Sequence, residues 1–297
     1  MTAATRDHDE TDCKTHEHGK VTRPAGNVRA NGRNIAAALS KCDCGFSTDR
    51  IVTGAATVHI GGRMAARIGE HTVHGATLAG GSSNVLIGGP SGGATIGNPY
   101  AGNGVCKALA AGRASGSTKQ SFDNCGIESS RLLIHQSREG TDAPKPLENE
   151  MLMEQVHRQV DRQRRGPTKP CQWRGTRGGT LPEERVAILE RWGVGAELAH
   201  QDLETIAHAT SDGNGVITAH DAGVLWDDSN YNGSGHAVTV IGMDYDENGQ
   251  PKTVIVADTG TGNCHAEIPA DRFARSLKPG KKRSEERRVG KECRSRW

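Results

Sequence analysis

Two side chains in the second half of the chain have the types and surroundings that nucleophilic catalysis needs. Cys125 opens the stretch CGIESSRLLIHQ, which has the amphipathic pattern of a helix, so we expect it at a helix N-terminus. Unpaired backbone N–H groups at that position stabilise a thiolate and lower the pKa of a thiol. His236 opens an apolar stretch after the loop Gly-Ser-Gly, where it is placed to act as a base. A buried structural cysteine and a hydrogen-bonded histidine at a strand edge are the alternatives.

Two further residues complete a site of this kind. Asp258 ends the apolar stretch 253–258, across a predicted hairpin turn from the strand of His236, so its carboxylate is expected to orient the imidazole. Gln120 lies five residues before Cys125, and its side-chain amide is a candidate donor to an oxyanion. The apolar-Asp-Thr-Gly sequence at Asp258 is also typical of aspartic proteases, which need two such carboxylates. The chain has one copy, so the pairing with His236 favours thiol chemistry.

Metal-ligating residue types recur in the first half of the chain at matching positions. His18, Cys44 and His74 are each followed by glycine, and each precedes a short predicted strand by 10 to 14 residues. Imidazole and thiolate are the usual ligands of structural zinc, which takes four. We therefore expect these three residues to bind Zn²⁺, with Cys42 favoured over His16 as the fourth ligand. Ordinary turn residues are the alternative.

An internal repeat must position these ligands. The segments 27–33 and 57–63 match at an offset of 30, and 84–89 is a partial third copy. Each copy alternates apolar and polar residues and closes with glycine, the pattern of a short strand and its turn. Three equivalent strands with three equivalent ligands indicate a pseudo-threefold object whose ligands meet on its axis. So small a unit has little room for a hydrophobic core, so metal binding would contribute to its folding.

The second half combines helices with an antiparallel sheet. Helical patterns come first and strands joined by a hairpin turn follow, which is the order of an α+β domain. The predicted helices cover 124–136, 147–165, 182–192 and 198–209, and the predicted strands cover 215–218, 237–243 and 253–258. The Gly/Ser/Asn/Pro-rich region before the first helix is typical of a linker, which we place at 94–106.

Length and charge limit the class of protein. The 297 residues predict about two domains, and no apolar run approaches the ~18 to 20 residues that span a bilayer. The N-terminus lacks an apolar export signal, which leaves export by a signal-independent route. The net charge is only +2, so the composition gives little support to a nucleic-acid partner.

The last stretch, residues 283–297, has no periodicity and no apolar face. It resembles the translation of a sequencing-adapter oligonucleotide, so we leave it out of the fold prediction; a basic tail for nucleic acid is the alternative. Outside it the chain has seven cysteines, an odd number that does not indicate a disulfide framework. Cys106, Cys171 and Cys264 lie in no motif and are expected as core or loop thiols.

Residues 17–93 resemble a PAAR-type domain. The similarity is carried by NGRNIAA at 31–37, GGRMAARIGE at 61–70, HGATLAGGS at 74–82 and NVLIGG at 84–89. Glu70 stands where the family usually has Asp. The family forms a small β-cone with zinc near its apex, caps the VgrG-type spike trimer of bacterial type VI secretion systems, and carries extensions into target cells. The resemblance therefore implies a structural Zn²⁺, a VgrG-type partner, and secretion from the bacterial cytoplasm into target cells.

Residues 107–277 resemble the papain-like superfamily, and most of all the peptidase-like toxin domains of bacterial effectors. Cys125, His236 and Asp258 occur in the order of that superfamily, and the stretch 215–238 adds to the similarity. Asp258 stands where papain has Asn, and Gln120 is one residue closer to the cysteine than its counterpart. The resemblance implies a cysteine peptidase without a catalytic cofactor, a target-cell protein as substrate, and a cognate immunity protein as partner.

The sequence thus predicts an N-terminal arm (1–16), a small all-β PAAR-like cone with a zinc-bound tip (17–93), a linker (94–106) and a papain-like α+β peptidase domain (107–280). The expected function is that of an antibacterial effector, delivered on the type VI spike, which cleaves peptide bonds by Cys-His-Asp catalysis. A papain-fold peptidoglycan amidase, deamidase or acyltransferase is one alternative. A non-enzymatic protein of the spike tip is another.

Overall fold

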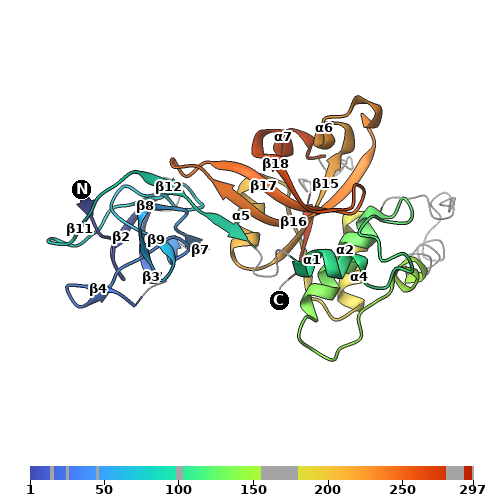
Figure 1. Cartoon of the computed structure of the whole chain (residues 1–297), viewed down its shortest axis with the longest axis horizontal. Helices are drawn as coiled ribbons and strands as arrows, with labels where there is room; N and C mark the ends of the chain where they lie inside the picture. Colours follow the sequence, from blue (N-terminus) through green and yellow to red (C-terminus); the bar gives the residue numbers. More distant parts are fainter. Residues whose placement is uncertain are drawn as a thin grey trace. The chain divides into compact units, whose positions relative to one another are not determined.

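A computed structural model describes residues 1–13, 17–24, 27–44, 47–97, 103–154, 180–278 and 291–295. The chain divides into two compact units (Figure 1). The first consists of residues 1–96 together with 243–253, and the second consists of 97–242 together with 254–297. Residues 1–96 contribute only strands to the first unit, whereas the second combines helices with a sheet.

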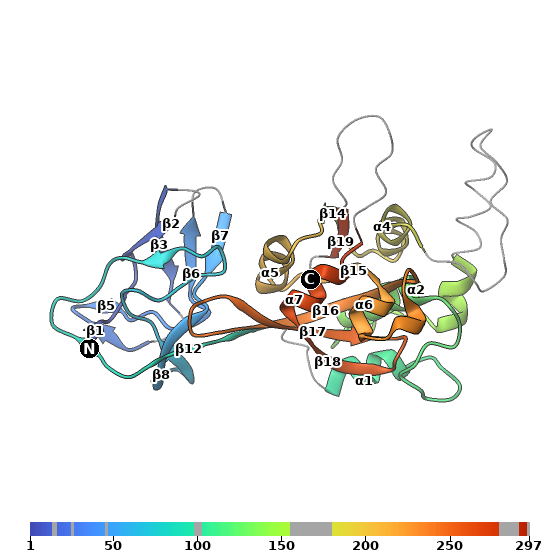
Figure 2. The same cartoon turned by 90° about the horizontal axis from the view of Figure 1, so that it is seen from above.

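Short strands build the first unit. They are β1 (Thr2–Ala3), β2 (Glu10–Cys13), β3 (Glu17–Arg23), β4 (Arg29–Ala30), β5 (Arg33–Asn34), β6 (Lys41–Cys44), β7 (Ser47–Arg50), β8 (Thr53–Ile60), β9 (Arg63–Ala65), β10 (Thr77–Leu78), β11 (Leu86–Ile87) and β12 (Ser91–Gly93). The largest sheet has the order β10-β2-β3-β6-β7, and β12-β8-β9, β1-β11 and β4-β5 form separate sheets. Figure 2 shows β2, β3, β6 and β7 side by side. The expected all-β first half is therefore confirmed.

A threefold repeat of the backbone generates these strands. His8, Leu39 and Gly69 follow one another at spacings of 31 and 30 residues, and their φ angles are all positive, at 62°, 69° and 91°. Only glycine adopts this conformation without steric cost, so the surrounding fold must hold His8 and Leu39 in it. The turn is the same in all three copies although the residue type differs.

A polar bond across three residues closes each of these turns. The pairs are Arg6 Nε to Asp9 at 3.0 Å, the Ala37 backbone N–H to Ser40 Oγ at 3.0 Å, and Arg67 Nε to Glu70 at 2.7 Å. The first copy thus begins within the first ten residues. Strand β1 pairs with β11 and β2 pairs with β3, so residues 1–13 are part of the unit and not the separate arm we expected for 1–16. A two-residue strand such as β1 has no period for a sequence pattern to show.

The second unit is organised around a sheet. Its strands are β13 (Thr95–Gly97), β14 (Ala196–His200), β15 (Gly215–Asp221), β16 (Gly235–Tyr245), β17 (Pro251–Asp258), β18 (Asn263–Pro269) and β19 (Lys291–Ser295). The order is β14-β19-β15-β16-β17-β18, and β13 also pairs with β16. The tip of the β16–β17 hairpin, residues 243–253, is grouped with the first unit. Helices precede and interrupt these strands, so the α+β class is confirmed.

One helix occupies the centre of the second unit. The helices are α1 (Asn103–Ala110), α2 (Cys125–Ser137), α4 (Pro182–Arg191), α5 (Leu203–Ser211), α6 (Ala222–Trp226) and α7 (Ala270–Ser276), and Ser229–Tyr231 form the 3-10 helix η1. Helices α1 and α4 both contact α2, which also contacts β15 (Figure 1). Ile127 and Leu133 of α2 join Ile217 of β15 in one buried cluster. Glu128 and Arg131 of α2 are fully buried as well, so they need partners inside the protein.

The predicted elements agree with most of this architecture. The helices at 124–136 and 182–192 and all three strands are confirmed. The helix predicted at 198–209 is wrong in its first part, because β14 ends at His200 and Asp202 caps α5, accepting a hydrogen bond from the Thr205 N–H at 2.8 Å. Of the helix predicted at 147–165, residues 148–154 are helical and the rest lies outside the described residues. Within the described ranges, no helix is long and apolar enough to cross a bilayer.

Two boundary predictions differ from the structure. The stretch 94–106 contains β13 and the beginning of α1 and is therefore not a plain linker; its residues 98–102 lie outside the described part. Residues 291–295, in the tail that we left out of the fold, form β19 between β14 and β15. Strands pair through their backbone groups, so a strand can join a sheet without an alternating pattern of apolar residues in its sequence.

A disulfide joins Cys106 of α1 to Cys264 of β18. The expectation that both are thiols is therefore wrong. The two cysteines are 158 residues apart, and only the fold brings them together. Cys171 lies outside the described residues.

Candidate active site

Cys125 is the first residue of α2, as the sequence predicts. The N–H groups in the first turn of a helix have no partner within the helix, and they create a positive potential at this end. The preceding residue, Asn124, makes no side-chain capping bond. The thiol also accepts a hydrogen bond from the backbone N–H of Ala237 in β16, which ties the helix terminus to the sheet. Cys125 is partly exposed, so a substrate has access to it.

His236 and Asp258 face each other on neighbouring strands. His236 is the second residue of β16 and Asp258 is the last residue of β17. The imidazole Nε2 and the carboxylate Oδ1 are 2.8 Å apart. The Cys125 thiol is hydrogen-bonded to the same imidazole, which leaves Nδ1 as the ring nitrogen toward the sulfur. Thiol, imidazole and carboxylate thus form one continuous chain, the arrangement required for an activated nucleophile.

The carboxylate of Asp258 is fixed by neighbours other than His236. The Gly260 N–H donates to Oδ1 at 2.8 Å and the Trp226 indole Nε1–H donates to Oδ2 at 2.6 Å. The rings of Trp226 and His236 are 4.7 Å apart between centroids. Trp226 therefore holds the carboxylate and also packs against the imidazole.

Glycine is required at position 260 by the closeness of the two rings. A Cβ atom there would lie 2.8 Å from Cε1 of His236 and 3.0 Å from the Trp226 ring. The first distance is shorter than carbon atoms tolerate and the second is unusually tight, so a side chain at Gly260 would displace the imidazole.

Electrostatics favour a thiolate–imidazolium pair. Burial alone would raise the pKa of Cys125, but its hydrogen bond to His236 and the charge of that residue outweigh burial and lower it. Burial would lower the pKa of His236, yet its bonds to Asp258 and Cys125 raise it to about 9. The bond to His236 also keeps the pKa of Asp258 below its usual value despite burial. At neutral pH an imidazole with a pKa of about 9 carries a proton, and the lowered pKa of Cys125 favours the thiolate beside it.

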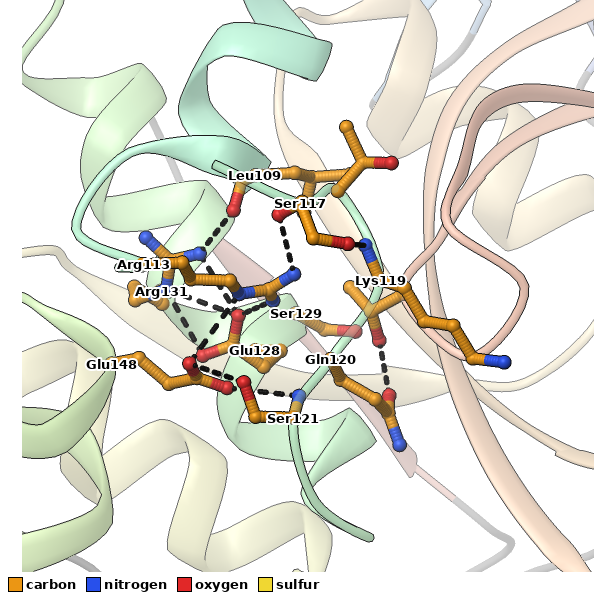
Figure 3. A network of polar contacts seen from close by, with 12 residues as sticks. Leu109, Arg113, Ser117, Lys119, Gln120, Ser121, Glu128, Ser129, Arg131 and Glu148 are labelled. Atoms are coloured by element: carbon orange, nitrogen blue, oxygen red, sulfur yellow. Dashed lines mark hydrogen bonds and ion pairs between the residues drawn. The ribbon is translucent and has the colours of Figure 1, made fainter. Parts of the chain in front are cut away.

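Gln120 is held so that one end of its amide remains available. Its backbone N–H donates to the Thr259 carbonyl at 2.8 Å, and the Thr259 hydroxyl donates to its side-chain Oε1 at 2.6 Å. Because the oxygen is engaged, the nitrogen is the end of the amide that is left to donate (Figure 3). This is the group that the predicted oxyanion role requires.

Three of the four predicted catalytic residues line a cavity of about 840 Å³. Cys125, His236 and Gln120 line it, and Asp258 lies behind the imidazole. The other lining residues are Lys119, Ser121, Phe122, Asp123, Ala222, Trp226, Asp228, Tyr231, Ser234, Gly235, Gly260 and Thr261. Aromatic and acidic side chains together offer both apolar and polar contacts to a ligand.

The sequence reasoning missed two residues of this site. Trp226 belongs to a stretch that we used only as part of a resemblance, and its role appears only when the fold places it beside Asp258. Thr259 is the middle residue of the Asp-Thr-Gly motif. The motif itself was visible in the sequence, but both interpretations of it concerned the carboxylate of Asp258. Neither predicted that the Thr259 hydroxyl bonds to Gln120.

A second group of functional side chains lies in the first unit. Cys44, Asp49 and His74 each offer a ligand atom, and these atoms all lie within 4.8 Å of one another. The buried thiol of Cys13 is hydrogen-bonded to that of Cys44. Cys13, Cys44 and His74 follow one another at spacings of 31 and 30 residues, the spacings of the three left-handed turns.

Two of the predicted zinc ligands are not in this group. His18 is exposed on β3, and Cys42 lies in a buried apolar cluster with Ile51 and Leu78. His16, the other candidate, lies outside the described residues. The prediction aligned the repeats on each ligand and the glycine that follows it. In the structure the repeats align on the left-handed turns at His8, Leu39 and Gly69, each of which precedes a ligand. That register selects Cys13 instead of His18.

The side chains that the structure gathers fit a zinc ion. Two thiols, an imidazole and a carboxylate are all ligand types that Zn²⁺ accepts, and four such ligands close a structural site. Cys13, Cys44 and Asp49 are buried, the side chain of His74 is 7% exposed, and the four residues come from all three repeats. Cys13, Cys44, Asp49 and His74 would hold the metal, and the metal would link the three repeats.

Comparison with known proteins gives one family match and several likenesses to solved structures. Residues 11–80 match the family model of the PAAR motif. No curated protein matches the chain. A double glycine motif protease from an AMS/PCAT transporter, solved with its leader peptide, is 16% identical, with 60% of this chain and 88% of that chain covered and a TM-score of 0.34. A protein described as a C39-like peptidase from Bacillus anthracis is 12% identical, with 59% and 89% covered and a TM-score of 0.36.

Proposed function

We propose that the second unit is a papain-like cysteine peptidase and that the chain is an antibacterial effector delivered on the spike of a type VI secretion system. The proposed activity rests on the hydrogen-bonded chain from Cys125 through His236 to Asp258, at the wall of a cavity that also holds Gln120. The PAAR match supports the proposed delivery route.

The proposed reaction has two stages. The Cys125 thiolate attacks an amide carbonyl carbon and forms a C–S bond, while Gln120 and the first-turn N–H groups of α2 donate to the developing oxyanion. The His236 imidazolium gives its proton to the leaving nitrogen, the C–N bond breaks, and a thioester remains. His236 then takes a proton from water, which attacks the thioester, releases a carboxylic acid and restores the thiolate–imidazolium pair.

The first unit carries a feature that fits a trimeric partner. Val28, Val58 and Leu86 lie in the three successive segments of the repeat and are 46%, 36% and 53% exposed. Three such residues on a threefold unit suit a VgrG-type trimer, and a cognate immunity protein would bind the second unit.

The test of this function uses the full chain. Expressed in a susceptible bacterium without an immunity protein, the chain is expected to be toxic and to create new protein N-termini, which mass spectrometry maps across the proteome. The Cys125→Ala variant is expected to do neither. Ser229→Ala, which changes an exposed residue of η1, is the control and should behave like the parent.

Other outcomes would overturn specific parts of the proposal. Equal toxicity of Cys125→Ala would contradict thiol catalysis. Thiol-dependent toxicity with intact target chains of altered mass would show a deamidase or acyltransferase, and thiol-dependent loss of peptidoglycan amide bonds would show an amidase. Full secretion without toxicity would leave a non-enzymatic spike tip.

A further inference from the structure

A cluster of buried charges includes two residues of α2, the helix that begins at Cys125, and takes no part in the proposed reaction. It consists of Arg113, Glu128, Arg131 and Glu148, which are between 0% and 7% exposed (Figure 3). Arg113 pairs with Glu128, and its Nε lies 3.6 Å from Glu148. Arg131 pairs with Glu128 at 2.9 Å. Burial lowers the pKa of each arginine to about 10, so both remain cationic at neutral pH.

The contribution of these ion pairs to the stability of the fold does not by itself account for the cluster. Removing charges from water is expensive, and buried ion pairs are often no more stabilising than apolar side chains of the same volume. What distinguishes the cluster is the set of backbone groups that it holds. Arg131 donates to the Leu109 carbonyl at 2.6 Å, and Arg113 donates to the Ser117 carbonyl at 3.1 Å. Both bonds fix the chain segment that leads to Gln120.

Glu148 completes the set, because it reaches the residue next to Gln120. One carboxylate oxygen accepts from the Ser121 backbone N–H at 3.1 Å, and the other accepts from the Ser121 hydroxyl at 2.9 Å (Figure 3). Gln120 is held on its other side by Thr259. The segment is therefore clamped between the buried cluster and the loop that follows Asp258.

We propose that Glu148 is a positioning residue for the oxyanion site: through Ser121 it fixes the segment that presents the Gln120 amide to the reacting carbonyl. This inference rests on the proposed function. The two arginines neutralise the charge of the buried carboxylates and hold Glu148 in place. Glu148 in turn holds Ser121, and so restricts the movement of the neighbouring Gln120. The bonds between Cys125, His236 and Asp258 do not involve it, so activation of the thiol is independent of Glu148.

The test compares two reactions of one thiolate in the full chain. Acylation by p-nitrophenyl acetate forms a C–S bond through a tetrahedral oxyanion and releases p-nitrophenolate. Alkylation by iodoacetamide displaces iodide and forms no oxyanion. The rates are measured against pH, and the rates of Cys125→Ala are subtracted. Because neither reagent needs a recognised peptide, the identity of the natural substrate does not matter.

Glu148→Gln is expected to lower the acylation rate about tenfold, because a misplaced donor loses much of its effect on the oxyanion. The alkylation rate and its pH dependence should not change. Ser121→Ala should show a smaller loss of the same kind, and Glu148→Gln should add little to Gln120→Ala. Glu150→Gln, an exposed change two residues away, is the matched control.

Unchanged acylation in Glu148→Gln would overturn the inference and leave the proposed function standing. A shift in the pH dependence of alkylation would also overturn it, because the variant would then have disturbed the Cys125–His236 pair. If the parent chain shows no acylation that depends on Cys125, the proposed function itself fails.

Discussion

Three consecutive residues, Asp258, Thr259 and Gly260, organise the candidate site. Asp258 orients His236, Thr259 engages the oxygen of Gln120, and Gly260 leaves room for the imidazole. The base and the oxyanion donor are thus both positioned from one tight loop. In an aspartic protease the same three-residue sequence supplies a catalytic carboxylate. Here the carboxylate is occupied by hydrogen bonds and serves to orient the imidazole.

The pH dependence of the reaction depends on His236. Because its bonds to Asp258 and Cys125 raise its pKa to about 9, the imidazolium that protonates the leaving amine is lost as the pH rises through that value. Peptide hydrolysis is therefore expected to decline above pH ~9, where the imidazole becomes neutral. In Asp258→Asn the pKa should fall toward the ordinary ~6.5, and the alkaline decline should move down with it. A pH–rate profile checks this, and an unmoved alkaline decline in the variant would contradict it.

Thr259→Val tests the orientation of Gln120. Valine keeps the shape and loses the hydroxyl, so the Gln120 amide can rotate and present either end to an oxyanion. We expect kcat to fall about tenfold with KM unchanged, and Thr259→Ser to restore it. Thr210→Val is a matched control, since Thr210 is also fully buried but lies in α5. Full additivity of Thr259→Val with Gln120→Ala would show that Thr259 acts by some other route.

At the scale of elements, the disulfide links the beginning of the second unit to β18. Cys106 lies in α1, and Cys264 follows the loop that comes directly after Asp258. A cross-link over 158 residues restricts the unfolded chain strongly. Such bonds persist mainly in oxidising compartments, so under the proposed secretion the chain would gain this stability on leaving a reducing cytoplasm.

Reduction of this disulfide should therefore lower the free energy of unfolding by about 2 to 5 kcal/mol. Denaturant unfolding with and without a phosphine reductant measures the difference, and Cys264→Ala should match the reduced parent. Because Cys264 is not part of the triad, alkylation of Cys125 should continue at its usual rate in the reduced protein. A reductant effect that remains in Cys264→Ala would assign the loss of stability to some other cause.

The sequence predicts an element well where a clear period runs through it, as in α2 and the strands of His236 and Asp258. The triad could be predicted for the same reason, since its members lie at the ends of those elements. The metal ligands depended on register. An alignment on residue–glycine pairs selects His18, whereas the left-handed turns of the structure select Cys13. Contacts such as Trp226 to Asp258 join residues far apart in sequence, and no local pattern encodes them.

At the scale of the whole molecule, the proposed zinc site would add a link between repeats that already share strand pairings and small buried apolar clusters. Metal removal by a chelator should lower the melting temperature of the chain, because binding energy at such a site is folding energy. His74→Ala should abolish stoichiometric zinc, measured by elemental analysis. His18→Ala, which changes an exposed histidine close to Cys13 in the sequence, should retain the zinc. Because His74 belongs to both ligand sets, Cys13→Ala distinguishes them: zinc retained by Cys13→Ala and lost by His18→Ala would favour the ligand set first predicted from the sequence.

The tip of the β16–β17 hairpin is grouped with the first unit, and this affects how a cut in the backbone could separate the two units. The chain passes from one unit to the other at 96–97, again at 242–243 and once more at 253–254. A cut at 96–97 would divide the backbone into residues 1–96 and 97–297, yet residues 243–253 of the second piece would still belong to the first unit. We therefore expect the two pieces to stay together after one cut and to separate only when the packing of the hairpin tip within the first unit is also lost.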